Sequence, residues 1–369
     1  MKYVSSLVLL FLTKMCFAQQ QADFEVFPLP NIQVISSIET SPDQSYMAIG
    51  TGQGPLYFWD FEKNEVIRTI DIDGFYAGPR LKFSNDGKYL LCQQQFYLNF
   101  SPNKDKPVRV EVLDIASGKF IFNREGVHAA QLLSDNKTLV TLEGNMINVF
   151  DFLSGDKLRS QTVPETMFAM AVSPDMKTIA ISHKTEKEDL DELPFFRSDK
   201  DARKQALKKT HIVALYDFET FKRKGLVQEI FDLVFSVTYS KDGKDLMIYT
   251  LPHSRQGARP GGLVGFISKA EAQTGVVTRA TFMSKLAEPD FKVHSDNQII
   301  GVGSIELKGR SVPQVLLSDY NTGTLLKKFD VNTRFMEVLS DGRITFAFPP
   351  HHNFVIVAYG NKIAKWKLK

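Results

Sequence analysis

Acidic residues recur at fixed places along this chain, and carboxylates are natural candidates for acid–base or metal chemistry. The first set stands in turns such as SPDQSY and SNDGKY, and its members are Asp43, Asp86, Asp135, Asp175, Asp242 and Asp296. The second set follows an apolar or aromatic residue, as in FWDFEKNE, and its members are Asp60, Asp114, Asp151, Asp217, Glu271 and Asp319. Asp and Ser side chains bond to the backbone of turns, and nearby Gly supplies positive φ. We therefore interpret both sets as turn residues and not as catalytic groups.

The remaining reactive residue types give no recognisable catalytic pattern. The sequence contains no G-x-S-x-G, H-E-x-x-H, P-loop or C-x-x-C-H motif. Beyond Cys16, Cys92 is the one cysteine, which excludes a clustered thiolate metal site. His351 and His352 form the only histidine pair and fall in an expected turn, while His128 and His183 are isolated. We expect no bound metal and no cofactor.

The spacing of the acids indicates an internal repeat. Each member of the first set lies between two short apolar segments, and each member of the second set lies between two more. Two hairpins per copy predict four strands, a to d, in each unit. A seventh copy, FPPHHNFVIVAYG, carries His351 in the place of the turn acid. Repeats at this period are typical of propellers and solenoids.

Seven such units, with c strands ending as Trp59-Asp60 does, resemble the WD-repeat β-propeller family, and especially its degenerate bacterial, YVTN-like type. The pair Trp59-Asp60 is the one literal WD, and the family's Gly-His dipeptide is missing. The resemblance covers roughly residues 24 to 369. It implies an all-β, seven-bladed β-propeller of four-stranded antiparallel blades.

The last copy contains strands a, b and c, with no segment left for strand d. The segment DFEVFPLP, from Asp23 to Pro30, precedes the first strand a. We expect it to supply the missing outer strand and so to close the ring by an N-terminal strand. Closure removes the open sheet edges that promote aggregation.

Residues 1–18 read as a signal peptide, with a short apolar run and the small residue Ala18 before QQQ. Residues 19–369 are then one propeller domain, with residues 184–210 inserted in blade 4. Losing Lys2 and Lys14 takes the formal net charge from +3 to +1, so we expect no attraction to nucleic acid. No later segment is apolar enough for a transmembrane span. The expected localisation is exported, either periplasmic or secreted.

The long insertions all fall between strands b and c and therefore on one predicted face. They span residues 93–108, 184–210, 252–263 and 304–313. Because binding residues concentrate on loops held by a rigid scaffold, this elaborated face is the predicted binding surface.

Candidate binding residues follow from these insertions. In blade 4, DARKQALKK is a good helix former, and Ser198 to Asp201 has the spacing of a capping box. The apolar residues of this insertion either pack on the propeller rim or contact a partner. The candidate contact residues of the insertion are Phe195, Phe196, Arg197 and Arg203. A basic rim for an anionic group, against the alternative of solvated charge, would comprise His253, Arg255, Arg259 and Arg310. Aromatic residues recur near the channel mouth and either bind a ligand or pack between blades; the candidates are Tyr76 and Phe231, beside Phe75, Phe168 and Phe291.

The function that these features favour is a non-catalytic scaffold of the cell envelope. It would bind a protein or peptide partner through the b–c loop face, and we expect a monomer. The alternative is a propeller-type lactonase, or another small-molecule hydrolase, with its site at the channel mouth. No lactonase motif can be matched residue by residue, so fold alone does not decide between the two.

Overall fold

The structure is a computed structural model that describes most of the chain beyond residue 23. The described residues are 24–29, 34–52, 54–72, 75, 78–94, 108–164, 166–209, 211–228, 233–251, 264–284, 290–294, 299–308, 310–331, 344–349 and 353–368. The predicted signal peptide, Asp296 and the pair His351-His352 lie outside these residues.

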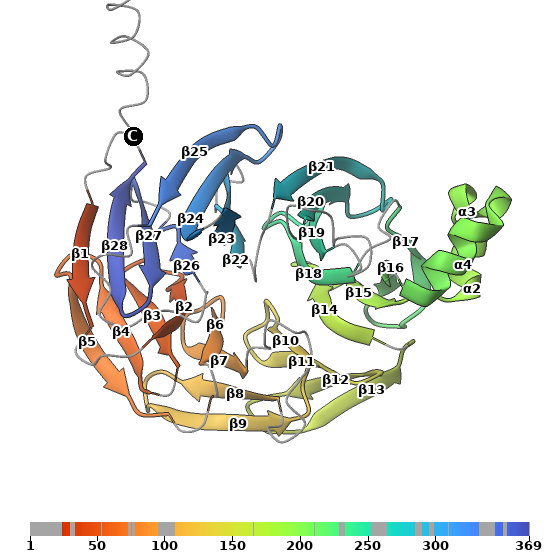
Figure 1. Ribbon diagram of the computed structural model, residues 1–369. Coiled ribbons are helices and arrows are strands. Elements are labelled where there is room, and N and C mark those ends of the chain that lie inside the picture. The colour runs from red at the N-terminus through yellow and green to blue at the C-terminus, as the bar shows by residue number, and fades with distance from the viewer. Residues whose placement is uncertain are drawn as a thin grey trace, which may run out of the picture.

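Within the described residues the strands form seven antiparallel sheets of four, arranged around a central axis (Figure 1). The predicted fold, an all-β seven-bladed propeller, is therefore confirmed. The innermost strands, a, are β2 (Ile35–Thr40), β6 (Pro79–Phe83), β10 (Ala129–Leu132), β14 (Thr166–Val172), β18 (Leu233–Tyr239), β22 (Asp290–Val293) and β26 (Ile344–Ala347). The b strands are β3 (Tyr46–Thr51), β7 (Tyr89–Gln94), β11 (Thr138–Glu143), β15 (Thr178–Lys184), β19 (Asp245–Leu251), β23 (Ile299–Lys308) and β27 (Phe354–Tyr359).

The two outer strands of each blade complete this order. The c strands are β4 (Leu56–Asp60), β8 (Arg109–Asp114), β12 (Met146–Asp151), β16 (His211–Asp217), β20 (Val264–Glu271), β24 (Arg310–Asp319) and β28 (Lys362–Lys367). The d strands are β5 (Glu65–Ile70), β9 (Lys119–Glu125), β13 (Lys157–Thr162), β17 (Arg223–Leu226), β21 (Val277–Ser284), β25 (Leu325–Asp330) and β1 (Phe24–Pro28). Blades 1 to 7 are numbered by their a strands in chain order.

The ring is closed by its first strand, as the sequence predicts. β1 pairs antiparallel with β28 in a continuous register from Phe24 opposite Trp366 to Pro28 opposite Lys362. Blade 7 therefore has the order β1-β28-β27-β26, with strands from both ends of the chain (Figure 1).

The core lies between the blades because the middle strands are buried on both faces. β4, with the sequence LYFWD, is buried from Leu56 to Trp59, whereas β5 alternates exposed and half-buried residues. One representative cluster joins blades 1 and 2 and includes Phe58, Phe83 and Leu90. Strands buried on both faces read as apolar runs, and outer strands show the period-2 pattern of a half-solvated surface.

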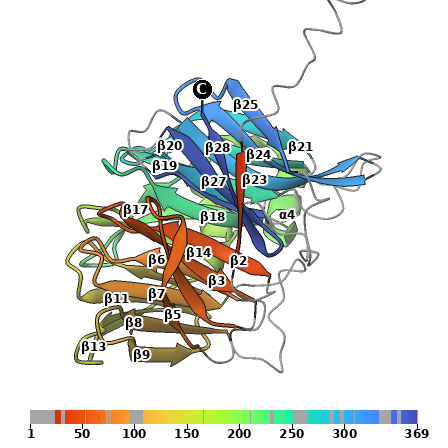
Figure 2. The ribbon, with the colours of Figure 1, turned by 90° about the vertical axis from the view of Figure 1, so that its left-hand side faces the viewer.

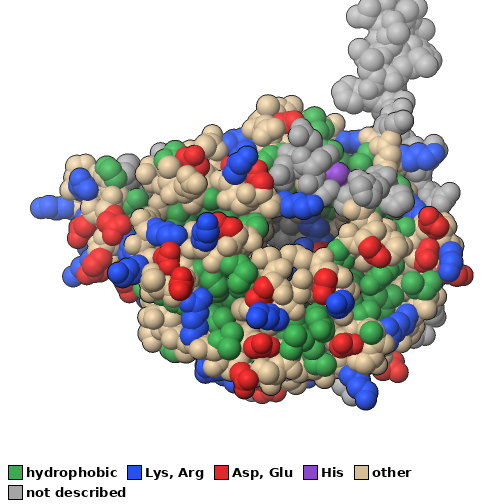
Figure 3. Space-filling model, turned by 180° about the vertical axis from the view of Figure 1, so that it is seen from behind, with side chains coloured by type: hydrophobic (Ala, Val, Ile, Leu, Met, Phe, Trp, Pro, Cys, Tyr) green, Lys and Arg blue, Asp and Glu red, His purple; other side chains and the backbone are tan. Residues whose placement is uncertain are grey.

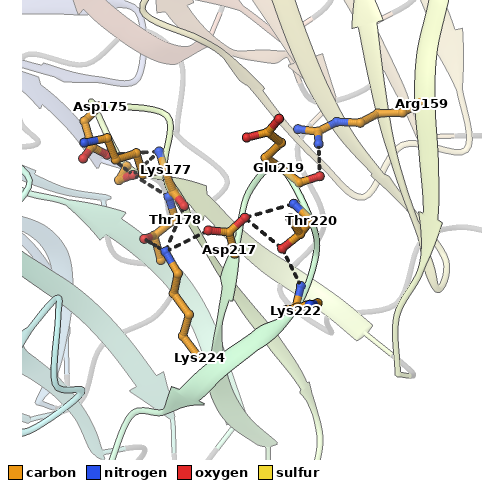
Figure 4. A network of polar contacts seen from close by, with 10 residues as sticks. Arg159, Asp175, Lys177, Thr178, Asp217, Glu219, Thr220, Lys222 and Lys224 are labelled. Atoms are coloured by element: carbon orange, nitrogen blue, oxygen red, sulfur yellow. Dashed lines mark hydrogen bonds and ion pairs between the residues drawn. The ribbon is translucent and has the colours of Figure 1, made fainter.

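The recurring acids stabilise turns, as predicted. Asp86 accepts hydrogen bonds from the Ser84 hydroxyl, at 2.7 Å, and from the Lys88 amide, at 3.1 Å. Asp217 accepts from the amide and hydroxyl of Thr220, both at 2.9 Å, and pairs with Lys224 at 3.3 Å (Figure 4). These interactions, the Thr220 amide first, lower the pKa of Asp217 to about 2.

A second recurring interaction, a hydrogen bond from a basic side chain, joins neighbouring blades along their outer edge. At one equivalent position of strand d, a basic side chain donates to a backbone carbonyl of the next blade. Arg159 donates to Glu219 O at 2.6 Å (Figure 4). Arg279 donates to Tyr320 O at 2.5 Å, and Arg68 donates to Ile115 O. The Arg159 guanidinium also stacks 4.4 Å from the Phe218 ring centroid. We call these three side chains the seam arginines.

Candidate interaction surface

Two elaborations of the propeller lie on the same face. The helices α2 (Lys187–Glu192), α3 (Pro194–Ser198) and α4 (Lys200–Lys209) connect β15 to β16, and a long hairpin connects β23 to β24. Both are b-to-c connections, so the alternating strand directions place both on one side of the ring. The β23–β24 tip projects from that side of the molecule (Figure 2). None of the helices among the described residues has the length and apolar character to cross a membrane.

The predicted helix in the blade 4 insertion is confirmed as α4, but its predicted cap is wrong by one residue. Ser198 is the last residue of α3, and Asp199 caps α4 by accepting from the Ala202 amide at 2.8 Å. The capping box belongs instead to α2, where the Glu186 amide donates to the Asp189 carboxylate at 2.7 Å. Local spacing alone does not distinguish an N-cap from the end of a preceding helical turn.

Apolar side chains fix the helices to blade 4. Leu190, Leu193, Phe196 and Ala206 are at most 4% exposed and share one cluster with residues of β15 and β16 such as Ile181. Phe196, a candidate for partner contact, is therefore buried, and for this residue the rim-packing alternative holds. Burying a large side chain contributes about 1.5–3 kcal/mol, so these residues hold the insertion firmly against the blade.

A buried charge cluster adds a polar attachment, which we call the Asp189 anchor. Asp189 of α2 is fully buried, and its Oδ1 lies 2.8 Å from Arg223 Nη1 on β17. Arg223 also pairs with Glu192 at 3.3 Å, and His183 of β15 lies 3.8 Å from Asp189. A buried carboxylate is tolerated only when it is paired and hydrogen-bonded, so the anchor ties α2 to strands b and d of its own blade.

The outer surface of the insertion carries basic side chains. Lys200, Lys204 and Lys208 recur every fourth residue of α4, are exposed, and have no ion pair with any described residue. Residues spaced by four lie on one face of a helix, and we call these three the α4 lysines. The candidates Arg197 and Arg203 both bond to Asp191 of the same insertion: Arg197 Nε donates to its carbonyl at 3.1 Å, and Arg203 pairs with its carboxylate at 2.8 Å.

The blade 6 insertion differs from the predicted loop. Residues 304–313 extend β23 and β24 into one ribbon, paired without a break from Ile299 opposite Asp319 to Lys308 opposite Arg310. β22 and β25 pair only with its inner part, residues 300–303 and 314–318. Arg310 is thus placed by its backbone at the ribbon tip, far along the strand from the blade body.

The other predicted candidates remain predictions. His253, Arg255, Arg259, Tyr76 and Phe231 lie outside the described residues, and the side chain of Phe195 is not among those described. Of the aromatic residues predicted near the channel mouth, Phe75 is 3% exposed, and its ring centroid lies 4.5 Å from the Arg109 guanidinium. It belongs to the cluster that joins blades 1 and 2, which favours packing between blades for Phe75.

Ionisable groups elsewhere on the elaborated side are held in structural pairs. Glu143 accepts from Arg124 Nε and Nη2 at 3.1 and 2.9 Å; burial raises its pKa, but these bonds lower it more. Burial lowers the pKa of His128 and raises that of Glu111. Among the described residues no cluster of three or more metal-ligating side chains occurs. These shifts follow from burial and pairing.

Sequence reasoning missed the Asp189 anchor. In the sequence, residues 186–192 are an acidic run and His183 is an isolated histidine, and neither pattern indicates that Asp189 and His183 lie together. The available signal was position: Asp189 precedes Leu190, and Leu193 lies four residues from it, so the acid borders the apolar stripe of a helix.

Comparison with known proteins agrees with the architecture. No protein-family model matches the chain. A 164-residue segment is 24% identical to the pre-rRNA-processing protein crb3/ipi3 of Schizosaccharomyces pombe, and it covers 41% of this chain and 36% of that protein. The chain thus matches about a third of the length of this relative. The crystal structure of the Cps50 (Swd1) β-propeller domain of Myceliophteria thermophila superposes with a TM-score of 0.64 at 11% identity, over 93% of this chain and 98% of that domain.

The structural match supports the β-propeller architecture. At 11% identity the structural match establishes the fold alone, and the bacterial YVTN-like subtype is not confirmed. The identity of a partner must therefore be argued from the surface of this chain itself.

Proposed function

We propose that this protein is a non-catalytic scaffold that binds a protein partner through its b–c loop face, with the blade 4 insertion as the principal contact. The observation that carries the proposal is the combination of a rigidly attached insertion and an unpaired basic surface. The apolar cluster and the Asp189 anchor fix α2 to α4 on the blade, while the α4 lysines stay exposed. Side chains held in place before binding lose little entropy when a partner docks.

The charge of this surface indicates the kind of partner. Three lysines on one helix face attract an acidic protein surface or segment and raise the rate of its association. The predicted signal peptide, residues 1–18, supports a partner in the cell envelope or outside the cell. A hydrolase site at the channel mouth is the competing function, and it is an outcome of the test below.

The test is an affinity pull-down from native envelope extract with a variant that preserves packing. Replacing residues 185–209 by a linker would expose the blade 4 core, so the sharper variant is Lys200→Gln/Lys204→Gln/Lys208→Gln. A matched control, Lys137→Gln/Lys177→Gln/Lys241→Gln, removes the same charge from exposed a–b turns on the opposite face. We expect a partner that the unchanged protein and the control retain and the α4 variant loses, with weaker capture at higher salt.

Equal capture by the α4 variant would refute the insertion as the contact. Absence of any captured protein, together with hydrolysis of a lactone panel by the unchanged protein, would replace the scaffold with the enzyme.

A further inference from the structure

The channel has a second mouth on the face opposite the b–c insertions. Comparing one equivalent position of strand a across the seven blades shows which residues there are charged. The residue four positions before the acid of the a–b turn, or before His351 in blade 7, occupies an equivalent place in every blade. Around the ring these residues are Glu39, Lys82, Gln131, Ala171, Thr238, Lys292 and Ala347. Four of the seven are neutral, and the three charged ones come from blades 1, 2 and 6.

The three charged side chains converge inside the channel. Glu39 is ion-paired with Lys82 of blade 2, and its Oε2 lies 3.3 Å from Lys292 Nζ of blade 6. Lys292 also donates to Ile38 O at 2.6 Å. Blade 7 stands between blades 6 and 1, so Lys292 can reach Glu39 only along the inner surface of the ring.

A third cation lies one step deeper on the same strand. Arg80, two residues before Lys82 on β6, is exposed, and its guanidinium lies 5.8 Å from the ring centroid of Phe235 on β18. Blades 2 and 5 are not neighbours, so this contact crosses the channel. Arg80 forms no ion pair with a described residue.

Among the side chains that the structure describes, the balance of charge at this mouth is positive. Burial raises the pKa of Glu39, but Lys82 and Lys292 lower it more, so the pKa lies below its ordinary value and the carboxylate stays ionised at neutral pH. Of the described side chains, one ionised carboxylate therefore faces three cations. The side chain of Lys82 is 68% exposed while that of Glu39 is 13% exposed, so solvent meets the cations first.

We propose that the channel mouth on the a–b turn face binds a compact anionic group, a carboxylate or a phosphate, between Lys82, Lys292 and Arg80. The view of this face shows a central hollow with Lys and Arg side chains at it (Figure 3). Charged lysine and arginine donors form the strongest hydrogen bonds to such oxygens. This site lies opposite the proposed partner surface and does not depend on it.

The test measures binding of two probes by calorimetry at constant ionic strength, with chloride as the reference anion. Inorganic phosphate and a short glutamate-rich peptide distinguish a phosphate from a carboxylate ligand. Lys292→Met and Arg80→Met should each weaken the bound probe at least about tenfold, because each removes a charged donor. Glu39→Gln should tighten it, because the competing carboxylate is lost.

The matched control is Lys88→Met, which removes a lysine from the same face but outside the channel, where it pairs with Asp86 of its own turn at 3.7 Å. The control should bind as the unchanged protein does. Failure of both probes to bind in preference to chloride overturns the proposal. So does weaker binding by Glu39→Gln, which would mean that the three residues serve only to join the blades.

Discussion

Replacing Arg223 by Met tests whether the Asp189 anchor holds the blade 4 insertion in place. The substitution keeps the aliphatic bulk against the blade but leaves the fully buried Asp189 without its cation. Removing one partner of a buried ion pair costs about 3–5 kcal/mol. The Arg223 side chain is 25% exposed, so water can replace part of the lost interaction, and we expect about 2–3 kcal/mol.

The assay is hydrogen exchange at the α2 amides, supported by urea unfolding. Hydrogen exchange reports the free energy of local opening. The opening free energy of the α2 amides should fall by about 2–3 kcal/mol, while that of the blade 2 strands should not change. The double variant Asp189→Asn/Arg223→Met should recover about 1–2 kcal/mol of it, because no charge is then buried unpaired.

Arg203→Met provides the matched control within the same insertion. Its partner Asp191 is 69% exposed, so the loss should be at most about 1 kcal/mol. Equal effects of Arg223→Met and Arg203→Met, or a double variant less stable than Arg223→Met, would falsify the assignment of Asp189 as a buried, charge-dependent anchor.

Two further predictions concern the ring and its turns. Deleting residues 24–28 removes strand d of blade 7 and exposes the edge of β28, so the melting temperature of the whole protein should fall; an unchanged value would contradict ring closure as a source of stability. Asp217 has a folded-state pKa of about 2 against 3.8 for the free side chain, so its contribution to stability is complete above pH 3.8 and is lost as the pH falls toward 2. Asp217→Asn should therefore lose less stability than the unchanged protein between pH 5 and pH 2.5 in urea unfolding, and equal losses would refute this.

The fold was predictable because the repeat supplies the same signal seven times. Each turn acid, such as Asp86 or Asp217, is specified by local hydrogen bonds that its own neighbours provide, so sequence spacing carries the information. Closure by residues 24–28 followed from counting strands, since a three-stranded last blade requires a fourth from elsewhere.

The site was less predictable because its interactions join distant residues. Asp189 and Arg223 are brought together by the return of the chain from the insertion to strand d, and no local pattern specifies that distance. The sequence predicts residues 304–313 as an insertion between strands b and c, whereas residues 304–308 and 310–313 extend β23 and β24, with Pro313 opposite Ile305. The seam arginines, such as Arg159, satisfy carbonyls of another blade and gave no signal within their own repeat.

The pairing of β1 with β28 also sets the order in which the blades can fold. β1 precedes every complete blade in the chain, and its partner, Lys362–Lys367, follows blades 1 to 6. Chains fold from the N-terminal side as they are synthesised, and contacts between distant residues form slowly. Blades 1 to 6 can form as they emerge, whereas blade 7 must wait for β28. A chain cut short at any point before β28 has no strand to receive β1 and cannot complete the ring, so closure requires that all seven blades have been synthesised.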